Sequence, residues 1–369
     1  MNQFQQKLTD LLNRGTKEGV YPGAVLLIAQ KGQIIFLKEA GNLSTIPEIL
    51  PMKRNTIFDL ASLTKPLAAA LAVMKLVNDK RVDLDQPLSD IIRADSLKDK
   101  KAVTLRSILS HCAGFRDWMP FYLDLMKYSA DTRKKVLRER IIEEPLQYVQ
   151  GSGFLYSDLG FMVLEWVIES ISGETLREFV HSNFFIPMGL KRTYLSTGDP
   201  PFSMDEYAAT EDCPWRKRII RGEVHDENAY STGGYSGHAG LFGTAEEVFV
   251  VADMLRGHYL GTRSDYFSPD IVRMFFKRQG IIKGSTWALG WDTPCPENSS
   301  AGRYISTNSV GHLGFTGTSI WMDLDRDVLT VFLSNRIHPS RSNLKIRAFR
   351  PVLHNLIFKE VAEPHESLY

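Results

Sequence analysis

The sequence predicts an α/β (α+β) fold in which one antiparallel sheet is built from both ends of the chain and flanked by helices. Two observations support this prediction. Strand-like apolar runs occur in pairs near each terminus, and the residues between these pairs change to helical spacing. We therefore predict a sheet domain formed by residues 1–84 and 286–369, with residues 85–285 as an inserted, mostly helical domain.

The N-terminal end combines a helix with a hairpin. The apolar residues at positions 4, 8, 11 and 12 have the spacing of an amphipathic surface helix. The apolar runs 24–29 and 34–37 follow, with Lys31-Gly32 between them. A glycine between two such runs is typical of a β-hairpin turn.

The C-terminal end repeats this hairpin pattern. Two strand-like runs, 318–322 and 328–333, flank the polar segment 325–327. Apolar residues at 349, 352, 353, 356 and 357 then predict a helix that packs against the sheet. Pro351 must lie in the first turn of this helix or break it, because proline lacks the amide N–H.

Three helix starts are recognisable in the middle of the chain. Thr104 caps residues 105–109, Asp131 begins a basic helix that runs to Ile142, and Ser157 caps a run with apolar residues between 159 and 167. A crevice between such an insertion and a sheet is a usual place for an active site.

The overall composition excludes several classes of protein. The 369 residues are 43% apolar, and 44 Lys and Arg residues balance 43 Asp and Glu residues, mixed along the chain. This pattern is typical of a globular protein and offers no basic stripe for a nucleic acid. The most apolar helix, 67–77, contains Lys75 and is too short to span a bilayer. The N-terminus lacks a basic start followed by an apolar run, so we expect a cytoplasmic protein.

The cysteines and histidines point to no metal or disulfide framework. Cys112, Cys213 and Cys295 are odd in number and far apart, which favours a reducing compartment. No CxxC or HExxH pattern occurs. The segment His225-Asp226 and His238 could join a metal site or line a cleft, but we interpret them as polar loop residues that shape a turn. No metal and no cofactor is predicted.

Ser62 and Lys65 form the most informative motif, Ser-Leu-Thr-Lys. Three residues are nearly one helical turn, so the hydroxyl and the amine share a helix face. A serine needs a neighbour that takes its proton before it can act as a nucleophile, and a desolvated lysine can be that base. The same pattern occurs at Ser342 and Lys345, within an Arg-rich segment with surface character. Without catalysis, Ser62 would be a helix N-cap and Lys65 a solvated side chain.

Two further motifs accompany Ser62. Tyr156-Ser157-Asp158 opens a helix in the middle region, and His312-Leu313-Gly314 lies in a late strand-like segment. With the three motifs in this order, the chain resembles the serine β-lactamase and penicillin-binding-protein superfamily. It is most similar to the class C-like branch, which includes family VIII esterases and D-alanyl peptidases. The resemblance covers most of the chain, from residue 21 to the last strands.

The resemblance implies a β-lactamase/transpeptidase-like fold and a role for each motif. Ser62 would attack a carbonyl and become acylated, while Lys65 would hold or take its proton. Tyr156, made acidic by adjacent cations, would carry that proton to the leaving group and later activate water. The backbone N–H groups of Ser62 and Phe315, the latter following Gly314, would form the oxyanion hole. If these residues have no catalytic role, Tyr156 is a half-buried aromatic residue at a helix start and His312 is a histidine at a strand edge.

Two positions depart from the family pattern. The second motif usually ends in Asn, whereas the Asp158 carboxylate would pair with Lys65 and keep it charged. The third motif usually carries Lys-Thr, which binds a substrate carboxylate, but here His312 is mostly neutral near pH 7 and Leu313 has no donor. Arg116 or Arg303 could substitute for the missing cation.

The functional prediction is a serine hydrolase that works through a Ser62 acyl-enzyme on small-molecule esters, amides or β-lactams, with a preference for neutral esters. D-alanyl-D-alanine carboxypeptidase and β-lactamase activities are the alternatives among enzymes. A non-catalytic, penicillin-binding-like module is the alternative from another class. We expect no nucleic-acid partner and no membrane span, and the oligomeric state stays open.

Overall fold

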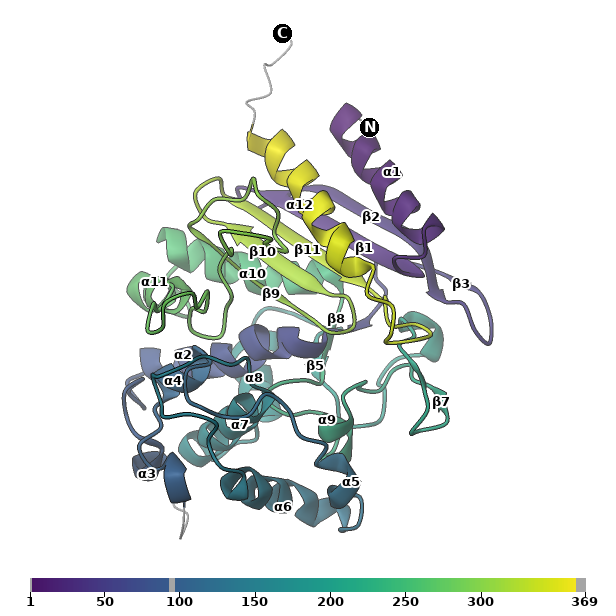
Figure 1. Ribbon diagram of the computed structural model, residues 1–369. Helices are drawn as coiled ribbons and strands as arrows, with labels where there is room; N and C mark the ends of the chain where they lie inside the picture. Colours follow the sequence, from purple (N-terminus) through teal and green to yellow (C-terminus); the bar gives the residue numbers. More distant parts are fainter. Residues whose placement is uncertain (1, 93–96, 363–369) are drawn as a thin grey trace.

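Six strands form one antiparallel sheet, in the order β3-β2-β1-β11-β10-β9 (Figure 1). The computed structural model describes residues 2–92 and 97–362. The strands are β1 (Gly23–Gln30), β2 (Gln33–Ser44), β3 (Leu50–Pro51), β9 (Ser309–Leu313), β10 (Ser319–Asp323) and β11 (Val328–Ser334). The β1–β2 and β10–β11 hairpins are as predicted, and β1 pairs with β11 from Ala24 opposite Ser334 to Gln30 opposite Val328. One sheet built from both termini is therefore confirmed.

Both faces of this sheet are covered by helices. Along β1, Ala24, Leu26 and Ile28 face a core shared with α1 (Gln3–Lys17) and α12 (Ile346–Ala362). The alternate residues of β1 belong to a second, larger core on the other face. The helix α10 (Ala245–Leu260) packs against β1 and β11 there. Figure 1 shows α1 and α12 side by side on the outer face.

Pro351 lies inside α12, at its sixth residue, so the prediction that it occupies the first turn or breaks the helix is wrong. Its missing N–H leaves the carbonyl of Arg347 without the usual helical hydrogen bond. Apolar residues on both sides of Pro351, including Phe349, Leu353 and Ile357, are buried against the sheet. Their burial keeps the helix continuous through the proline.

Helices dominate the rest of the chain. They are α2 (Leu71–Asn78), α3 (Leu88–Ile91), α4 (Leu105–Leu109), α5 (Tyr122–Leu125), α6 (Ala130–Glu143), α7 (Asp158–Ser172), α8 (Leu176–Val180), α9 (Glu227–Ser231) and α11 (Pro269–Phe276). The caps at Thr104 and Ser157 occur as predicted. Within the described ranges, no helix is long and apolar enough to cross a membrane.

Short strands join the helical region to the sheet region. A three-stranded sheet has the order β4-β8-β5, formed by β4 (Phe58–Asp59), β8 (Leu241–Gly243) and β5 (Tyr194–Leu195). A two-stranded sheet pairs β6 (Asp212–Cys213) with β7 (Arg218–Ile219). The division into residues 1–84 with 286–369 and residues 85–285 stays a prediction. We note that α10, from the middle segment, packs on the main sheet.

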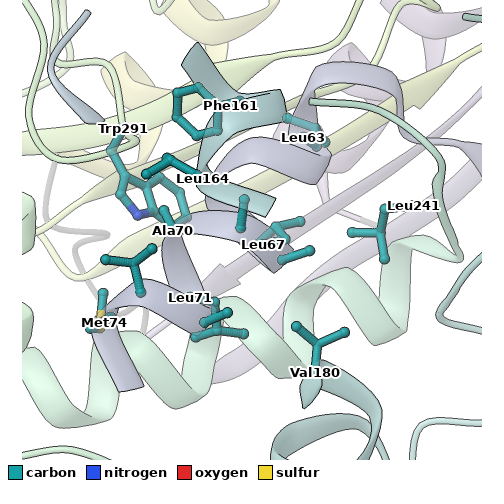
Figure 2. Packing of buried hydrophobic residues seen from close by; sticks show 14 of the residues in the cluster. Leu63, Leu67, Ala70, Leu71, Met74, Phe161, Leu164, Val180, Leu241 and Trp291 are labelled. Carbon is teal, nitrogen blue, oxygen red and sulfur yellow. The ribbon is translucent and has the colours of Figure 1, made fainter. Parts of the chain in front are cut away.

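The segment with Ser62 and Lys65 is not one continuous α-helix. After β4 it forms a 3-10 turn (Ala61–Leu63), then a π-helical turn (Lys65–Ala70), and only then α2. Leu63, Leu67, Leu71 and Met74 pack in the large core with Phe161 and Leu164 of α7 (Figure 2). Wide turns of this kind are frequent at functional sites.

Candidate active site

A strained turn presents Ser62 at the start of its helical segment. Ala61, just before it, has a φ of 48°, in the left-handed backbone region that residues other than glycine rarely adopt. The buried Asp59 holds this turn, because its carboxylate accepts hydrogen bonds from the amides of Ala61 and His225. Backbone strain of this kind is kept only where surrounding contacts maintain it. Asp59 was not among the predicted site residues.

Lys65 lies between the serine and a carboxylate. Its Nζ is 3.2 Å from Ser62 Oγ, 2.6 Å from Oδ1 of Asp158 and 3.3 Å from the backbone oxygen of His238. Its side chain has 0% exposure, whereas that of Asp158 has 18%. The predicted contacts of Lys65 with Ser62 and with Asp158 are both present.

The protonation states of this group follow from its contacts. Burial disfavours the charge on Lys65, but its contacts, first among them that with the Asp158 carboxylate, outweigh burial and raise the pKa of Lys65. Desolvation raises the pKa of Tyr156, and the opposing effect of Lys65 is smaller. The expectation that adjacent cations make the Tyr156 phenol acidic is therefore wrong: in the free protein it is a neutral phenol and Lys65 is an ammonium.

Aromatic rings position Tyr156. Its ring centroid lies 4.7 Å from that of His111 and 5.4 Å from that of Trp287, and Lys65 Nζ lies 4.7 Å from the centroid of the phenol ring. His111 Nδ1 accepts a hydrogen bond from the amide of Ser157. Burial and Lys65 keep the pKa of His111 well below its ordinary value, so its ring is neutral. His111 belongs to a segment, residues 105–114, that contributes to the resemblance to the family, but neither His111 nor Trp287 was predicted to be a site residue.

The end of β9 closes the site from the sheet side. His312 is buried, and its Nδ1 donates to the backbone oxygen of Leu313 at 2.9 Å. Burial and Lys65 lower the pKa of His312 to about 3, so the imidazole is neutral, as predicted for pH 7. A Cβ on Gly314 would lie 2.6 Å from the carbonyl oxygen of Leu60, so only glycine lets this strand approach the Ser62 turn so closely.

The two amides expected to form the oxyanion hole belong to adjoining segments. Thr316 and Thr318 donate through their hydroxyls to the carbonyls of Asp59 and Leu60, which ties the loop after β9 to the turn before Ser62. Phe315 lies in this loop and lines the same two cavities as Ser62. The oxyanion role of the Ser62 and Phe315 amides stays a prediction.

Two cavities meet at Ser62. The first, of about 410 Å³, we call the histidine cavity; its lining comprises Asp59, Ala61, Ser62, Trp118, Tyr156, Asp158, His225, Asp226, Glu227, His238, Ala239, Phe315 and Arg341. The second, of about 380 Å³, we call the arginine cavity; it is lined by Ser62, Tyr156, Trp287, Asp292, His312, Leu313, Gly314, Phe315, Arg336, Ile346, Arg347 and Arg350. His225 and His238 line the cleft, so interpreting them only as turn-shaping loop residues is wrong.

Charged groups in the histidine cavity are mutually paired. His238 Nε2 lies 2.9 Å from Asp226 Oδ1, and Arg341 lies 2.6 Å from Glu227. Ligand atoms of Asp158, Asp226 and His238 lie within 4.8 Å of one another, a spacing that a metal ion could bridge. Asp158 is already paired with Lys65, and Asp226 with His238, so each carboxylate of this group has a partner within the protein.

The arginine cavity has a different charge balance. Arg336 donates only to backbone carbonyls, and Arg350 Nη2 donates to the carbonyls of Gly314 and Thr318. Burial and a neighbouring arginine lower the pKa of Arg336 to about 10 and that of Arg350 to about 9. Within residues 2–92 and 97–362, the exposed Arg347 side chain has no ion pair, and the buried Arg350 Nε has no hydrogen-bond partner.

Arg116 and Arg303, the arginines proposed from sequence, are not in either cavity. Arg116 pairs with Glu144 at 2.7 Å, and Arg303 donates to the hydroxyl of Tyr304. The arginines that do line the arginine cavity come from elsewhere: Arg336 follows β11, and Arg347 and Arg350 lie on α12. No local sequence motif marks these three residues. The fold alone brings them beside His312.

Comparison with known proteins identifies the family. The model of the Beta-lactamase family matches residues 8–351. The chain belongs to this β-lactamase family. It is therefore a β-lactamase-related serine hydrolase with the predicted fold class.

Relatives within the family carry different names. The chain is 28% identical over 361 residues to "N-acetylmuramyl-L-alanine amidase" of Bacillus subtilis, an alignment that covers 90% of this chain and 81% of that protein. It is 30% identical over 368 residues to "Putative D-alanyl-D-alanine carboxypeptidase" of Escherichia coli O157:H7, with 92% and 82% covered. The structure of "EstCE1, a hydrolase with promiscuous acyltransferase activity" superposes with a TM-score of 0.73 and 22% identity, covering 94% of this chain and 98% of that one.

Proposed function

We propose that this serine hydrolase cleaves an amide bond in small peptidoglycan fragments, through an acyl-enzyme on Ser62, and that its leaving group carries a free carboxylate. The observation that carries this proposal is the arginine cavity beside Ser62, with Arg347 and Arg350 only partly satisfied by the protein. The names of the two sequence relatives, an amidase and a carboxypeptidase, support the same substrate class.

Acylation follows from the contacts of Lys65. Ser62 Oγ attacks the amide carbon, and its proton passes to Lys65 Nζ as Lys65 passes one of its own protons to Asp158. This relay uses the distances of 3.2 Å and 2.6 Å and leaves Lys65 charged throughout. Tyr156 gives its phenolic proton to the leaving nitrogen as the C–N bond breaks, and the proton on Asp158 returns to Tyr156 through Lys65. The amides of Ser62 and Phe315 bind the oxyanion.

The leaving group occupies the arginine cavity in this proposal. Three guanidinium groups line it, against one carboxylate, Asp292, which already accepts hydrogen bonds from Thr286 and Thr293. A substrate carboxylate would satisfy Arg347 and offset the mutual repulsion of the arginines. The preference for neutral esters, predicted from His312 and Leu313, assumed that no cation lies here. These arginines remove that premise.

The acyl group occupies the histidine cavity. Trp118 and Phe315 line it with 41% and 48% exposure, which is large for aromatic side chains. Asp226 and Glu227 add carboxylate acceptors on the same lining. Exposed aromatic faces can pack against apolar parts of a ligand, and carboxylates can accept hydrogen bonds from its hydroxyl groups. Such a lining suits an amphipathic group that carries hydroxyls. The muramyl group named for the Bacillus subtilis relative is of this kind.

D-alanyl-D-alanine carboxypeptidase activity is the second candidate. Its leaving D-alanine also ends in a carboxylate, so the same arginine cavity favours it. The two candidates differ in the acyl group, a muramyl lactyl group or a peptide, and in the configuration of the leaving alanine, L or D.

Matched substrates test the proposal. N-acetylmuramyl-L-alanine, the same compound with its carboxylate converted to a carboxamide, a peptide that ends in D-Ala-D-Ala and a neutral p-nitrophenyl ester are compared by kcat/KM. A charge-assisted contact is worth roughly 1.5–3 kcal/mol, so we expect about a 10- to 100-fold preference for the free carboxylate. Arg347→Gln should abolish this preference, and Arg303→Gln, which alters an exposed arginine outside both cavities, should not. Equal rates for acid and carboxamide, with the neutral ester preferred, would leave the enzyme as an esterase.

We further propose that the enzyme works in the cytoplasm on released fragments. Cys112, Cys213 and Cys295 are all free, and Cys295 is exposed. Exposed free thiols persist most readily in a reducing compartment.

A further inference from the structure

The acyl-enzyme still has to be hydrolysed, and this second step needs a base for water. Lys65 is held as an ammonium by Asp158, and Tyr156 is a neutral phenol. The relay that acylates Ser62 takes its proton from the Ser62 hydroxyl, which contacts Lys65. In the acyl-enzyme this oxygen is part of the ester and carries no proton, so the attacking water needs a different base. Among the described residues, two histidines of the same cavity, His225 and His238, pair with carboxylates, and one of these pairs adjoins Lys65.

That pair is His238 with Asp226. Asp226 Oδ1 lies 2.9 Å from His238 Nε2 and also accepts from the amide of Ala229, so the carboxylate is fixed as the N-cap of α9. His238 has 1% exposure, and its backbone oxygen accepts from Lys65 at 3.3 Å. Both residues line the histidine cavity together with Ser62 and Tyr156.

One nitrogen of the pair is unused. With Nε2–H donating to Asp226, the neutral imidazole of His238 has its lone pair on Nδ1, and this atom is buried without a partner among the described residues. The Nδ1 atom of His258 in α10 is also without a partner among these residues, so what sets His238 apart is its place beside Lys65 in the cavity that Ser62 lines. A base fixed by a carboxylate on one nitrogen and free on the other is the arrangement of nucleophilic hydrolases.

We propose that His238, oriented by Asp226, is the general base that activates the deacylating water. This inference rests on the Ser62 acyl-enzyme of the proposed function. Water oxygen attacks the acyl carbon as one of its protons moves to His238 Nδ1. The bond between the acyl carbon and Ser62 Oγ then breaks, Oγ takes a proton from Lys65, and the carboxylic acid product leaves. Its acidic proton goes to solvent, and the proton on His238 returns to Lys65 through Asp158 or water.

The surroundings of His238 set the direction of its pH dependence. Burial disfavours its charge, but Asp226 by charge and hydrogen bond, and Asp158 by charge, outweigh burial and the opposing charge of Lys65. The pKa of His238 is therefore raised above its ordinary value of 6.5. Because the base must be unprotonated, we expect deacylation to accelerate as pH rises through a value above 6.5.

The test separates the two chemical steps. Stopped-flow release of p-nitrophenol from a p-nitrophenyl ester measures acylation as a burst and deacylation as the later steady state, and mass spectrometry of the intact protein detects the adduct. In His238→Gln and Asp226→Asn, the burst rate should stay within about threefold of wild type. Deacylation should fall by roughly 10²- to 10⁴-fold, the usual contribution of a general base. The adduct on Ser62 should then accumulate, and the pH dependence of deacylation should disappear in His238→Gln.

His258→Gln is the matched control. His258 is also fully buried and pairs with an aspartate, Asp265, at 3.1 Å, but it lies in α10 and lines neither cavity. If this variant changes the ratio of the two rates as much as His238→Gln does, the effect is structural and the proposal fails.

Other outcomes also overturn the proposal. Equal losses in both steps, or unchanged deacylation, would remove His238 from the role of base. A stoichiometric metal ion in the purified protein, measured by elemental analysis and lost in His238→Gln, would make the pair a metal site instead. If wild type forms no adduct on Ser62 with any ester, then the acyl-enzyme itself, and with it the proposed function, is wrong.

Discussion

Two segments of this chain share the pattern Ser-x-x-Lys and differ in almost everything else. Ser62 and Lys65 lie 3.2 Å apart, with Lys65 fully buried and paired with Asp158. Ser342 is exposed and shares a hydrogen bond with Ser340, while Lys345 donates to the backbone oxygen of Glu18. The Lys345 ammonium therefore contacts backbone instead of the serine three residues before it.

The difference shows that the chemistry comes from the surroundings of the pattern. At Ser62, a strained turn presents the hydroxyl to Lys65 and to the phenol of Tyr156, and Lys65 is in turn paired with Asp158 of α7. At Ser342, water competes for every polar group. Low local dielectric makes the charges at Ser62 interact strongly, whereas solvent screens those at Ser342.

Removal of the serine hydroxyls should give the largest contrast. Ser62→Ala should lower kcat for any ester or amide by roughly 10⁵- to 10⁶-fold, as expected for the loss of a nucleophile. Ser342→Ala should stay within about twofold of wild type, because exposed substitutions rarely matter. Steady-state kinetics with a p-nitrophenyl ester measures both. Comparable activity of the two variants would end the assignment of Ser62.

Truncation of the lysines should show a smaller contrast. Lys65→Ala removes the proton relay between Ser62 and Asp158, so kcat/KM should fall by roughly 10²- to 10⁴-fold. Lys345→Ala removes a donor to a backbone carbonyl at the surface and should leave kcat/KM unchanged. Both variants are followed by thermal unfolding, so that a loss of folded protein is not mistaken for a loss of catalysis.

Asp158→Asn should change the shape of the pH profile. The amide cannot take a proton from Lys65, so activity then requires Lys65 itself to be neutral. We expect kcat/KM to fall by about 10²-fold at pH 7 and to rise with pH toward 10, a rise that wild type lacks. Because Asp158 is a cause of the raised pKa of Lys65, this pKa should be lower in the variant.

The control is Asp79→Asn, which removes the carboxylate of a surface pair with Lys75 at 2.7 Å. Surface pairs contribute little, so its pH profile should match wild type. A flat profile for Asp158→Asn at full activity would exclude the relay.

The smallest effect concerns His312. Its pKa of about 3 keeps the ring neutral at every pH at which the protein is assayed. The ratio of kcat/KM for a free carboxylate to that for its carboxamide should therefore stay within about twofold from pH 5.5 to 8. Burial and Lys65 oppose a charge on His312, so acid does not turn this side chain into a cation for the substrate carboxylate. A ratio that rises as pH falls would show that His312 does titrate.

Much of the fold was predictable because it depends on local periodicity. The nearly continuous apolar runs of β1 and β11, and the caps at Thr104 and Ser157, are visible in a few neighbouring residues. Pro351 was mispredicted because its tolerance depends on burial of the residues around it, which is not a local property.

The sequence by itself determined the sheet built from both termini and the motif residues Ser62, Lys65 and Tyr156. The strand-like runs and the spacing of Ser62 and Lys65 are local patterns, whereas Tyr156 was recognised through the resemblance to the family. Only the tertiary structure decided which groups surround them. Arg347 and Arg350 on α12, and the pair of Asp226 with His238, reach Ser62 from distant segments. Burial also reversed the expected acidity of Tyr156, because desolvation raises the pKa of its phenol by more than the charge of Lys65 lowers it.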